Sequence, residues 1–466
     1  MGREDGDLPG DAEAAVAFEM SEERYRALRE RHPSLTYEGF TAEEREGNLV
    51  CHFEFSLEEG PTFRPALSIP LPTEGGGVPS GALKALVFRI GLVELISYWK
   101  AACPPRVVLR AGKLGAEEAA WWRWVWFHGL GEFFYLNKIG AEIDTFLTLE
   151  QDAAAPDWPL LPASGGKGIL VPIGGGKDSL VTLDLLRGHR DEVSCFLLGR
   201  TRAQAESVRL MGYGEAQVIQ GRRAIAPELL ELNRQGYLNG HTPFSAMLGY
   251  VTALTAALHG RRYIALSNES SASEPTVPGT EVNHQFSKGW EFERRFAAEL
   301  GRIAPGISYF SLLRPWNELR IAERFARIPG ALGVFRSCNV GSRDDRWCGK
   351  CPKCLFVDIL LAPFVGRAER SAVFGGFPPL EEASLQPIFD ELTGVAATKP
   401  FECVGEVGEV RAALALALEK GEAPVLVRDF ASGHGEKLPS AEEAAGVLRF
   451  FNDRNGVPAH LLPLLT

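Results

Sequence analysis

The sequence predicts an α/β protein: a central doubly wound parallel sheet, preceded by an N-terminal α+β domain and followed by a helical C-terminal tail. Three observations predict this class. Short apolar runs alternate with helical stretches beyond residue 166, a triple glycine joins the first run to a helix, and the 466 residues are 45% hydrophobic and 23% charged. Strands that alternate with helices indicate a parallel sheet covered on both faces. The composition is that of a globular protein.

The first 165 residues divide into a variable segment, residues 1–45, and an α+β domain, residues 46–165. Leu49–Phe55 and Thr62–Ile69 are predicted strands separated by a Glu-Glu-Gly-Pro turn. Leu83–Lys100 has apolar residues at helical spacing and is predicted to end before a Pro-Pro pair. We interpret the Trp-rich segment that follows as core or domain-interface packing rather than ligand stacking.

A linker rich in Ala, Pro, Ser and Gly leads to residues 166–364, which are predicted to form the sheet domain, and residues 365–466 form the helical tail. The predicted strands of the sheet are Gly168–Ile173, Ser194–Gly199, Ala216–Gln220, Tyr263–Ser267 and Ile307–Leu312. The predicted helices are Asp178–Arg187, Arg202–Met211, Pro243–His259, Phe286–Leu300 and Asn317–Ala326, with Glu409–Glu419 and Ala441–Asn452 in the tail. Pro172 is unusual for a central strand, because proline cannot donate to the ladder.

The net charge restricts the kinds of macromolecule that the protein is expected to bind. Lys and Arg number 49 and Asp and Glu number 60, a net charge of −11. This acidic excess argues against binding to nucleic acids or anionic membranes. The N-terminus has no signal-peptide pattern, and no apolar run reaches the ~18 residues of a spanning helix. We therefore expect a cytoplasmic protein with no nucleic-acid and no membrane partner.

The run Gly174, Gly175, Gly176, Lys177, Asp178 and Ser179 follows the first predicted strand and opens a helix. Glycines let the backbone turn tightly and bring N–H groups close to an anion, and the helix N-terminus adds partial positive charge. Lys177 can neutralise phosphate, Asp178 can hold Mg²⁺, and the Ser179 hydroxyl can reach a phosphate oxygen. Because Asp178 separates the lysine from the serine, this is not a Walker A loop. The strand–loop–helix context favours phosphate binding over a ligand-free turn.

Half of the eight cysteines crowd into one short segment, as Cys338, Cys348, Cys351 and Cys354. Four thiolates at this close spacing suit a tetrahedral Zn²⁺ site that is closed and structural. An iron–sulfur cluster uses the same ligands and stays open as an alternative. Four free thiols are the less favoured interpretation.

Polar segments lie near the ends of the predicted strands and helices, and open α/β sheets bind ligands at the carboxyl ends of their strands. The candidate substrate-binding residues are Asn268, Glu269, Ser273, Glu274, Asn283, Lys288 and Arg314. Lys288 and Arg314 are natural clamps for a carboxylate or phosphate. His241, His284 and Cys403 are the candidates for proton transfer. A helix-cap histidine or a buried, inert cysteine is the alternative for each.

The glycine run resembles the SGGxDS loop of the PP-loop ATP pyrophosphatases, with Gly174 in the place of the serine. The resemblance covers about residues 168–360. It implies a Rossmann-like sheet that binds ATP, transfers AMP to a substrate oxygen and releases pyrophosphate. The four-cysteine arrangement is similar to that of the 7-cyano-7-deazaguanine synthases, which are also PP-loop enzymes.

Six segments in order, GGGKDS, LNGHTP, SNESSASE, EVNHQFSK, WCGKCPKC and KPFECVGE, resemble the MurL-type epimerase family over about residues 60–410. The resemblance implies an isomerase that inverts the terminal glutamate of UDP-N-acetylmuramoyl-L-alanyl-L-glutamate from L to D in peptidoglycan precursor synthesis. ATP and Mg²⁺ are the implied cofactors, and the UDP-linked muramoyl dipeptide is the implied small-molecule partner. Lys177 is then expected to stabilise charge during adenylyl transfer, and Asp178 to help hold Mg²⁺.

Three alternatives stay open. A different PP-loop enzyme would end in amide, nitrile or thio transfer, which needs a nitrogen or sulfur donor. A nucleotide-sensing module would bind ATP without turnover. An epimerase of another glutamyl or peptide substrate would differ mainly in the N-terminal domain.

Overall fold

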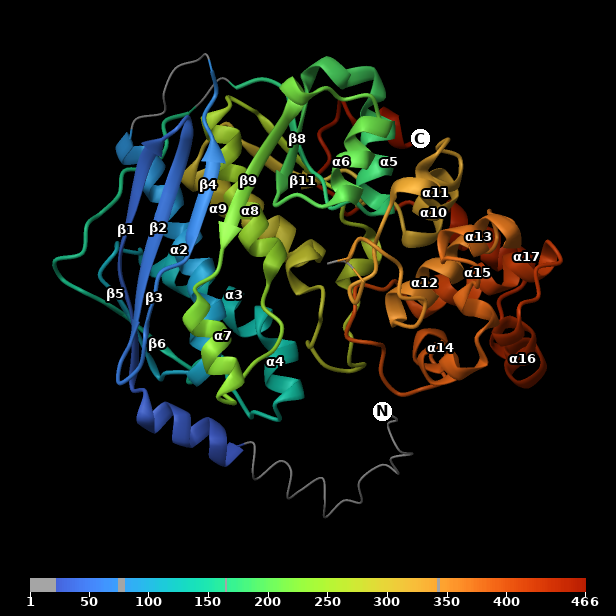
Figure 1. The fold of residues 1–466 in the computed structure, drawn as a ribbon, viewed down its shortest axis with the longest axis horizontal. Coiled ribbons are helices and arrows are strands. Elements are labelled where there is room, and N and C mark those ends of the chain that lie inside the picture. The colour runs from blue at the N-terminus through green and yellow to red at the C-terminus, as the bar shows by residue number, and fades with distance from the viewer. Residues whose placement is uncertain (1–21, 74–79, 164–165, 342–343) are drawn as a thin grey trace. The chain divides into compact units, whose positions relative to one another are not determined.

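The computed structural model describes residues 22–73, 80–163, 166–341 and 344–466 (Figure 1). Residues 1–21 of the predicted variable segment lie outside this range. The described residues fall into two compact units. Unit 1 contains those of Met1–Ser68, Pro79–Pro159 and Arg223–Tyr250, and unit 2 contains those of Ile69–Val78, Leu160–Arg222 and Val251–Thr466. The four-segment division given above stays a prediction.

The sheet of unit 1 is mixed. Strand β1 (Ser34–Arg45) pairs antiparallel with β2 (Asn48–Leu57) and parallel with β5 (Arg106–Leu109), which pairs parallel with β6 (Thr148–Gln151). Side chains along β2 alternate between buried and less buried positions, as expected of a strand with one covered face.

The strand predictions in unit 1 need correction. Strands β1, β5 and β6 were not predicted. The pairing register of β1 shifts between Tyr37 and Gly39, which interrupts the alternating pattern that identifies a strand, and β5 and β6 have only four residues each. The predicted strand Thr62–Ile69 is two strands, β3 (Thr62–Phe63) and β4 (Ala66–Pro70). Pro65 lies between them, and a proline has no N–H for the ladder.

The helices of unit 1 are built around aromatic side chains. They are α2 (Ser80–Ala102), α3 (Ala116–Gly129), α4 (Gly131–Leu136) and α7 (Pro227–Arg234), and α8 (Phe244–Leu258) begins in this unit. Trp99, Trp122 and Trp126 are almost completely buried. The Trp121 indole N–H donates to the Tyr250 hydroxyl at 2.9 Å. The interpretation of the Trp-rich segment as core is confirmed.

Parallel strands form the sheet of unit 2, in the order β11-β10-β7-β8-β9. They are β7 (Ile169–Pro172), β8 (Val193–Leu198), β9 (Val218–Ala224), β10 (Tyr263–Leu266) and β11 (Ser308–Ser311). All five predicted strands are therefore present. Pro172 is the last residue of β7, so its missing N–H falls at the end of the ladder.

Helices follow the strands of unit 2 largely as predicted. They are α5 (Lys177–Leu185), α6 (Arg202–Leu210), α9 (Trp290–Ile303), α10 (Glu318–Ala326) and the short α11 (Ala331–Val334). Helix α9 starts four residues later than predicted because extended Gly289 caps it, and Phe286–Lys288 form a separate 3₁₀ turn.

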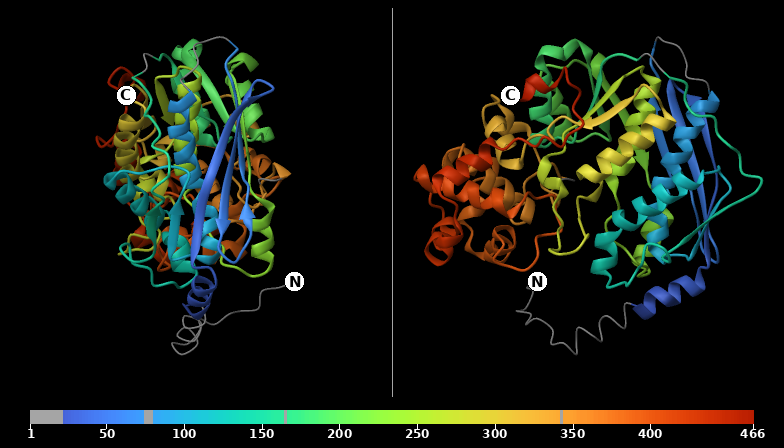
Figure 2. Two further views of the ribbon diagram at one scale, coloured as in Figure 1. Left: turned by 90° about the vertical axis from the view of Figure 1, so that its left-hand side faces the viewer. Right: turned by 180° about the vertical axis from the view of Figure 1, so that it is seen from behind.

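The tail is a group of helices drawn in orange and red (Figure 2). It comprises α13 (Arg367–Val373), α14 (Gln386–Thr393), α15 (Val407–Glu419), α16 (Val425–His434) and α17 (Ala441–Arg449), and α12 (Pro352–Leu361) precedes it. Apolar side chains of α12, α14, α15, α16 and α17 share one buried cluster, which includes Phe356, Phe389 and Leu414. Within the described ranges, no helix has the length and apolar character needed to cross a bilayer.

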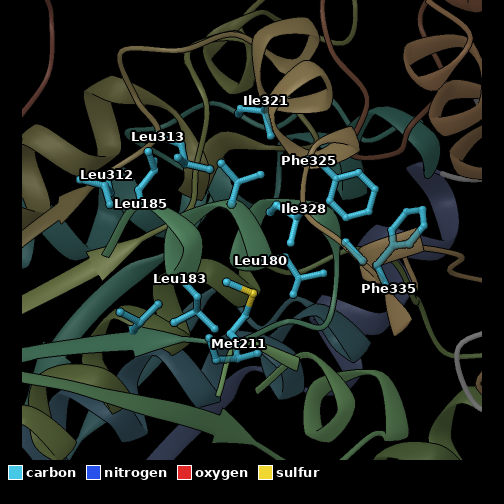
Figure 3. Close-up of a cluster of buried hydrophobic side chains, with 14 of the residues drawn as sticks. Leu180, Leu183, Leu185, Met211, Leu312, Leu313, Ile321, Phe325, Ile328 and Phe335 are labelled. Carbon is cyan, nitrogen blue, oxygen red and sulfur yellow. The ribbon is translucent and has the colours of Figure 1, made fainter. Parts of the chain in front are cut away.

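The main core of unit 2 fixes the helix that follows the glycine loop. Leu180 and Leu183 of α5 are fully buried, and they share a cluster with Met211 and with Ile321 and Phe325 of α10 (Figure 3). Burying each such side chain contributes about 1.5–3 kcal/mol. The N-termini of α5 and α10 are thus held together by the packing behind them.

Gly91 of α2 tests the close packing of unit 1. A Cβ at this position would lie 1.9 Å from the Tyr37 hydroxyl, and the Tyr37 ring is completely buried. We expect Gly91→Ala to lower the free energy of unfolding by about 2–3 kcal/mol, because the buried ring has no space to move into. Urea unfolding measures the change.

Gly301→Ala is the matched control, since Gly301 lies inside α9 with no atom within 4 Å of its added Cβ. Alanine there should stabilise the helix by about 0.5–1 kcal/mol. Equal effects of the two substitutions would contradict the packing described for Gly91.

Candidate functional site

The glycine loop joins β7 to α5 in a conformation that needs glycine. Gly175 has a φ of +84°, in the left-handed region, and Gly176 caps the N-terminus of α5. A Cβ on Gly175 would lie 3.0 Å from the backbone nitrogen of Gln204, and one on Gly176 would lie 3.0 Å from the Ser337 hydroxyl. The Ser179 hydroxyl donates to the Gly176 carbonyl oxygen at 3.1 Å. The loop therefore presents a tight turn at a helix N-terminus, which favours an anion.

Lys177 is a buried ammonium between two carboxylates. Its side chain is 2% exposed and forms ion pairs with Asp178 and Glu318. Burial alone would lower the pKa of Lys177, but the carboxylates of Asp178 and Glu318 outweigh it and raise the pKa. For the acid Asp178 the effect of burial has the opposite sign and alone would raise the pKa. The Lys177 ammonium outweighs it and holds the pKa of Asp178 below its usual value. Both groups are charged at neutral pH.

Glu318 is a site residue that the sequence reasoning missed. It lies in the first turn of α10, 2% exposed, and its backbone N–H donates to Oε1 of Glu409 at 3.2 Å. Burial raises the pKa of Glu318 to about 7, and the attraction of Lys177 only partly offsets this. Burial and the neighbouring carboxylates raise the pKa of Glu409 well above its ordinary value.

An ionised cysteine lies in the same unit. The Lys288 Nζ donates to the Cys403 Sγ at 3.2 Å, and His284 forms a side-chain hydrogen bond with Cys403. Burial alone would raise the pKa of Cys403, but the Lys288 ammonium and the bond with His284 outweigh it and lower the pKa to about 5. Three of the predicted site residues are thus brought together around one thiolate.

Three side chains from separate segments hold the chain around Cys403. Gln285 Nε2 donates to the Val404 carbonyl oxygen at 3.0 Å, Lys353 Nζ donates to the Cys403 carbonyl oxygen, and Asn339 Nδ2 donates to the Glu402 carboxylate. Glu402, Cys403 and Val404 are therefore each held by a side chain from a different part of the chain.

Arg314 has internal partners, although it was predicted to clamp a substrate. Its side chain is completely buried and pairs with Glu293 at 2.8 Å. It also donates to the backbone carbonyl oxygens of Glu269 and Lys288. These contacts join three segments of the chain at one guanidinium, and a role of Arg314 toward a substrate stays a prediction.

The other predicted substrate-binding residues surround the strand ends of unit 2. Asn268 Nδ2 donates to the Ser311 hydroxyl at 3.0 Å, and Asn283 Nδ2 donates to the Ala272 carbonyl oxygen at 3.0 Å. Glu274 pairs with Lys399. Glu269 is 4% exposed, and its carboxylate is one of the charges that raise the pKa of Lys177.

A cleft of about 580 Å³ opens beside these residues. Its lining includes Ser270, Ser273, Trp290, Asn317, Glu406 and Glu409. Glu409 also accepts a hydrogen bond from the backbone N–H of Glu318, so the cleft is separated by one residue from the partner of Lys177. Its volume falls in the range of small-molecule sites.

His241 belongs to unit 1. Its Nδ1 lies 4.0 Å from the Glu132 carboxylate. The adjoining Asn239 and Gly240 accept hydrogen bonds from the buried Lys100 at 2.8 and 2.6 Å. This segment is therefore anchored on α2.

The four predicted metal ligands converge. The Sγ–Sγ distances are 3.8 Å for Cys338–Cys351, 3.7 Å for Cys348–Cys354 and 3.5 Å for Cys351–Cys354. A tetrahedron with Zn–S bonds of ≈ 2.3 Å has edges of about 3.8 Å. The backbone N–H groups of Gly341 and Cys348 point at the Cys338 sulfur. The residues fit one tetrahedral metal ion, and a multi-atom iron–sulfur core would need more widely spaced sulfurs.

These features define an α/β protein that combines a tight glycine loop at a helix N-terminus, a cysteine with a lowered pKa and four cysteines that could hold a metal ion. The chain belongs to the MurL family. A family model described as MurL N-terminal domain matches residues 27–312, and one described as MurL C-terminal domain matches residues 334–442. The resemblance found in the sequence motifs is confirmed at this level.

Three similar proteins are each named UDP-N-acetyl-alpha-D-muramoyl-L-alanyl-L-glutamate epimerase. The one from Xanthomonas oryzae pv. oryzae (strain MAFF 311018) is 38% identical, covering 80% of this chain and 83% of the relative. Those from Salinispora tropica and Micromonospora sp. are 36% and 34% identical, covering 85% and 93% of this chain and 88% and 97% of the relatives. No solved structure matches the chain significantly.

Cys403 should react with iodoacetamide at unusually low pH. With a pKa of about 5, its thiolate is present above pH 5, so the alkylation rate should stay near its plateau at pH 6 and fall as the pH drops through about 5. An ordinary thiol with a pKa of about 8.5 is less than about 1% ionised at pH 6. Peptide mass spectrometry across a pH series measures the rate at Cys403.

Cys51 and Cys195 are internal controls, because burial raises the pKa of each to about 12. They should stay unmodified in the folded protein. A Cys403 midpoint near pH 8.5 would contradict the description of this residue as a thiolate.

The four-cysteine site should bind about one metal ion per chain. We expect Cys351→Ser to lose most of the metal and to lower the melting temperature by roughly 5–10 °C, since metal binding contributes to folding. Elemental analysis and thermal unfolding measure the two effects. Cys403→Ser is the matched control and should keep the metal. Full metal content in Cys351→Ser would exclude this residue as a ligand.

Proposed function

We propose that the protein is an ATP-dependent epimerase that inverts the terminal L-glutamate of UDP-N-acetylmuramoyl-L-alanyl-L-glutamate to D-glutamate. The names of three relatives, which align over most of their length, support the reaction and the substrate. The observation that carries the proposal is the Cys403 thiolate beside Lys288 and His284, in the same compact unit as the glycine loop.

Activation of the substrate explains a requirement for ATP. The α-proton of a free glutamate carboxylate is very weakly acidic, because its removal adds a second negative charge next to the first. Attack of the carboxylate oxygen on the α-phosphorus of ATP forms a mixed anhydride with AMP and releases pyrophosphate. The carboxylate charge is then masked, and the carbanion can delocalise into the acyl carbonyl.

The glycine loop is the proposed phosphate site. Counted along the chain, the strands of unit 2 have the order 3-2-1-4-5, and the direction of winding reverses beside β7. Doubly wound sheets bind ligands at such a reversal, outside the carboxyl ends of the strands. We therefore assign unit 2 to the PP-loop type. Gly174–Gly176 would contact phosphate, with Ser179 as a further donor, and Lys177 would stabilise the developing charge.

Asp178 is the proposed Mg²⁺ ligand, and the ion would neutralise phosphate charge when bound. Asp178 fits this role because it stays ionised at the loop and is less buried than Lys177. The four cysteines are the proposed Zn²⁺ ligands. They leave no open position for substrate, so this metal is structural.

Proton exchange is assigned to the cluster around Cys403. The thiolate takes the α-proton of the activated glutamate, while Lys288 and His284 keep the sulfur ionised between turnovers. Return of a proton to the opposite face gives the D centre, with His284 and His241 as the candidate donors. Hydrolysis of the anhydride then releases AMP and restores the carboxylate.

The cleft next to Glu409 is the proposed place for part of the substrate. Ser273, one of the predicted substrate-binding residues, lines it. Asn268, Glu269, Glu274 and Asn283 form the proposed wall at the strand ends. Arg314 would act indirectly, because its guanidinium holds the backbones of Glu269 and Lys288 in place.

Incubation with substrate, ATP and Mg²⁺ in deuterated water tests this function. Deuterium should enter the glutamate α-position only when ATP is present, and chiral analysis should find D-glutamate in the product. We expect Cys403→Ser to lower the exchange rate by about 10²–10⁴-fold, because a serine hydroxyl is a far weaker base, while pyrophosphate release continues.

Asp178→Ala separates the two stages. It should abolish pyrophosphate release and, as a consequence, exchange. Product without α-deuterium would eliminate proton abstraction, and exchange without nucleotide would eliminate activation. Undiminished exchange in Cys403→Ser would remove this residue as the base.

A further inference from the structure

Lys353 lies at the meeting point of the metal centre and the reactive cysteine. It stands between the ligands Cys351 and Cys354, in the first turn of α12. Its Nζ donates to the Cys403 carbonyl oxygen. The same ammonium is among the charges that lower the pKa of Cys403 and of Asp178. Lys353 therefore faces both the thiol and the glycine loop, although the sequence marks it only as a residue between two cysteines.

A second contact joins the metal centre to the same segment. Asn339 follows the ligand Cys338, and its Nδ2 donates to the Glu402 carboxylate. Residues next to two of the four ligands, Cys338 and Cys354, thus hold two consecutive residues, Glu402 and Cys403. The charged or titratable groups that face Cys403 are Lys288 and His284 from one segment, Lys353 from α12, and the adjoining Glu402.

We propose that Lys353 is a positioning residue that couples occupancy of the four-cysteine site to the reactivity of Cys403, an inference that rests on the proposed role of this cysteine. A bound ion fixes all four sulfurs, because metal–thiolate bonds have narrow length and angle ranges. Lys353 is thereby held against the Cys403 backbone. Without the ion, nothing holds the four sulfurs at one point, and Lys353 is no longer held in a fixed position.

This coupling differs from a purely structural role for the metal. A structural metal alone would change stability and leave the chemistry of Cys403 intact in whatever protein stays folded. Coupling through Lys353 predicts that loss of the metal and loss of the Lys353 charge have the same effect on the sulfur. That effect is a shift in the pH at which Cys403 becomes reactive.

The test is the pH profile of iodoacetamide alkylation at Cys403, followed by peptide mass spectrometry. It compares the zinc-loaded protein, the chelator-stripped protein, and Lys353→Met. We expect both altered forms to be alkylated about five- to tenfold more slowly at pH 5, because one positive charge near the sulfur is lost or displaced. Restoring zinc to the stripped protein should restore the rate.

Two variants act as controls. Lys353→Arg keeps the charge and a donor and should remain close to the unaltered protein. Lys350→Met removes an exposed lysine from the same loop and should have no effect. The metal content of each variant is measured alongside, and Lys353→Met should retain its zinc.

An unchanged profile in folded Lys353→Met would overturn the coupling, as would an unchanged profile in the stripped protein. If Lys353→Met does not fold, the stripped and reconstituted protein decides alone. The proposed function fails differently. If the alkylation midpoint of Cys403 lies near pH 8.5 in the zinc-loaded, unsubstituted protein, Cys403 is not a thiolate and the proposed function fails. If that midpoint is low and Lys353→Met does not change it, only the coupling is refuted.

Discussion

The buried ion pair between Lys177 and Glu318 is the constraint on which unit 2 depends. Removing two charges from water costs several kcal/mol each, and only close pairing and further hydrogen bonds offset that cost. Asp178 supplies a second carboxylate to the ammonium, and Glu409 accepts from the Glu318 backbone. The ion pair therefore holds the N-terminus of α5 against the N-terminus of α10, and it stabilises the tight turn of the glycine loop.

Burial and neighbouring charge shift the pKa values of two side chains in opposite directions within one compact unit. Glu409 is deeply buried beside other carboxylates, and both effects raise its pKa well above the ordinary value. Cys403 is also shielded from water, but Lys288 and His284 outweigh the effect of burial and remove its proton. The direction of each pKa shift is thus set by the partners that the side chain meets.

The sequence predicts the local features of this fold well and the contacts between distant segments poorly. The strands of unit 2 are short and apolar with clear breaks, so pattern alone finds all five. Strands β1, β5 and β6 of unit 1 were missed. The irregular register of β1 hides the alternation, and β5 and β6 have only four residues each, too few to show a pattern. The glycine loop and the four cysteines also carry local signatures, and their geometry agrees with those signatures.

The site as a whole could not be derived from the sequence. Lys288 and Cys403 are 115 residues apart, so their contact depends on the fold. Glu318 follows an N-cap asparagine, and a glutamate there is ordinary at any helix start. Arg314 suggested a substrate clamp because arginine binds anions, but the chain uses it to join three of its own segments.

The half-buried sulfur of Cys403 has a consequence for the protein in an aerobic environment. An ionised thiol with some solvent access is the form that peroxides oxidise most readily, first to a sulfenic acid and then irreversibly to higher acids. Each oxygen atom added would fill space between Lys288 and His284 and occupy their donors. The arrangement that keeps this side chain ionised thus also makes it sensitive to oxidative inactivation.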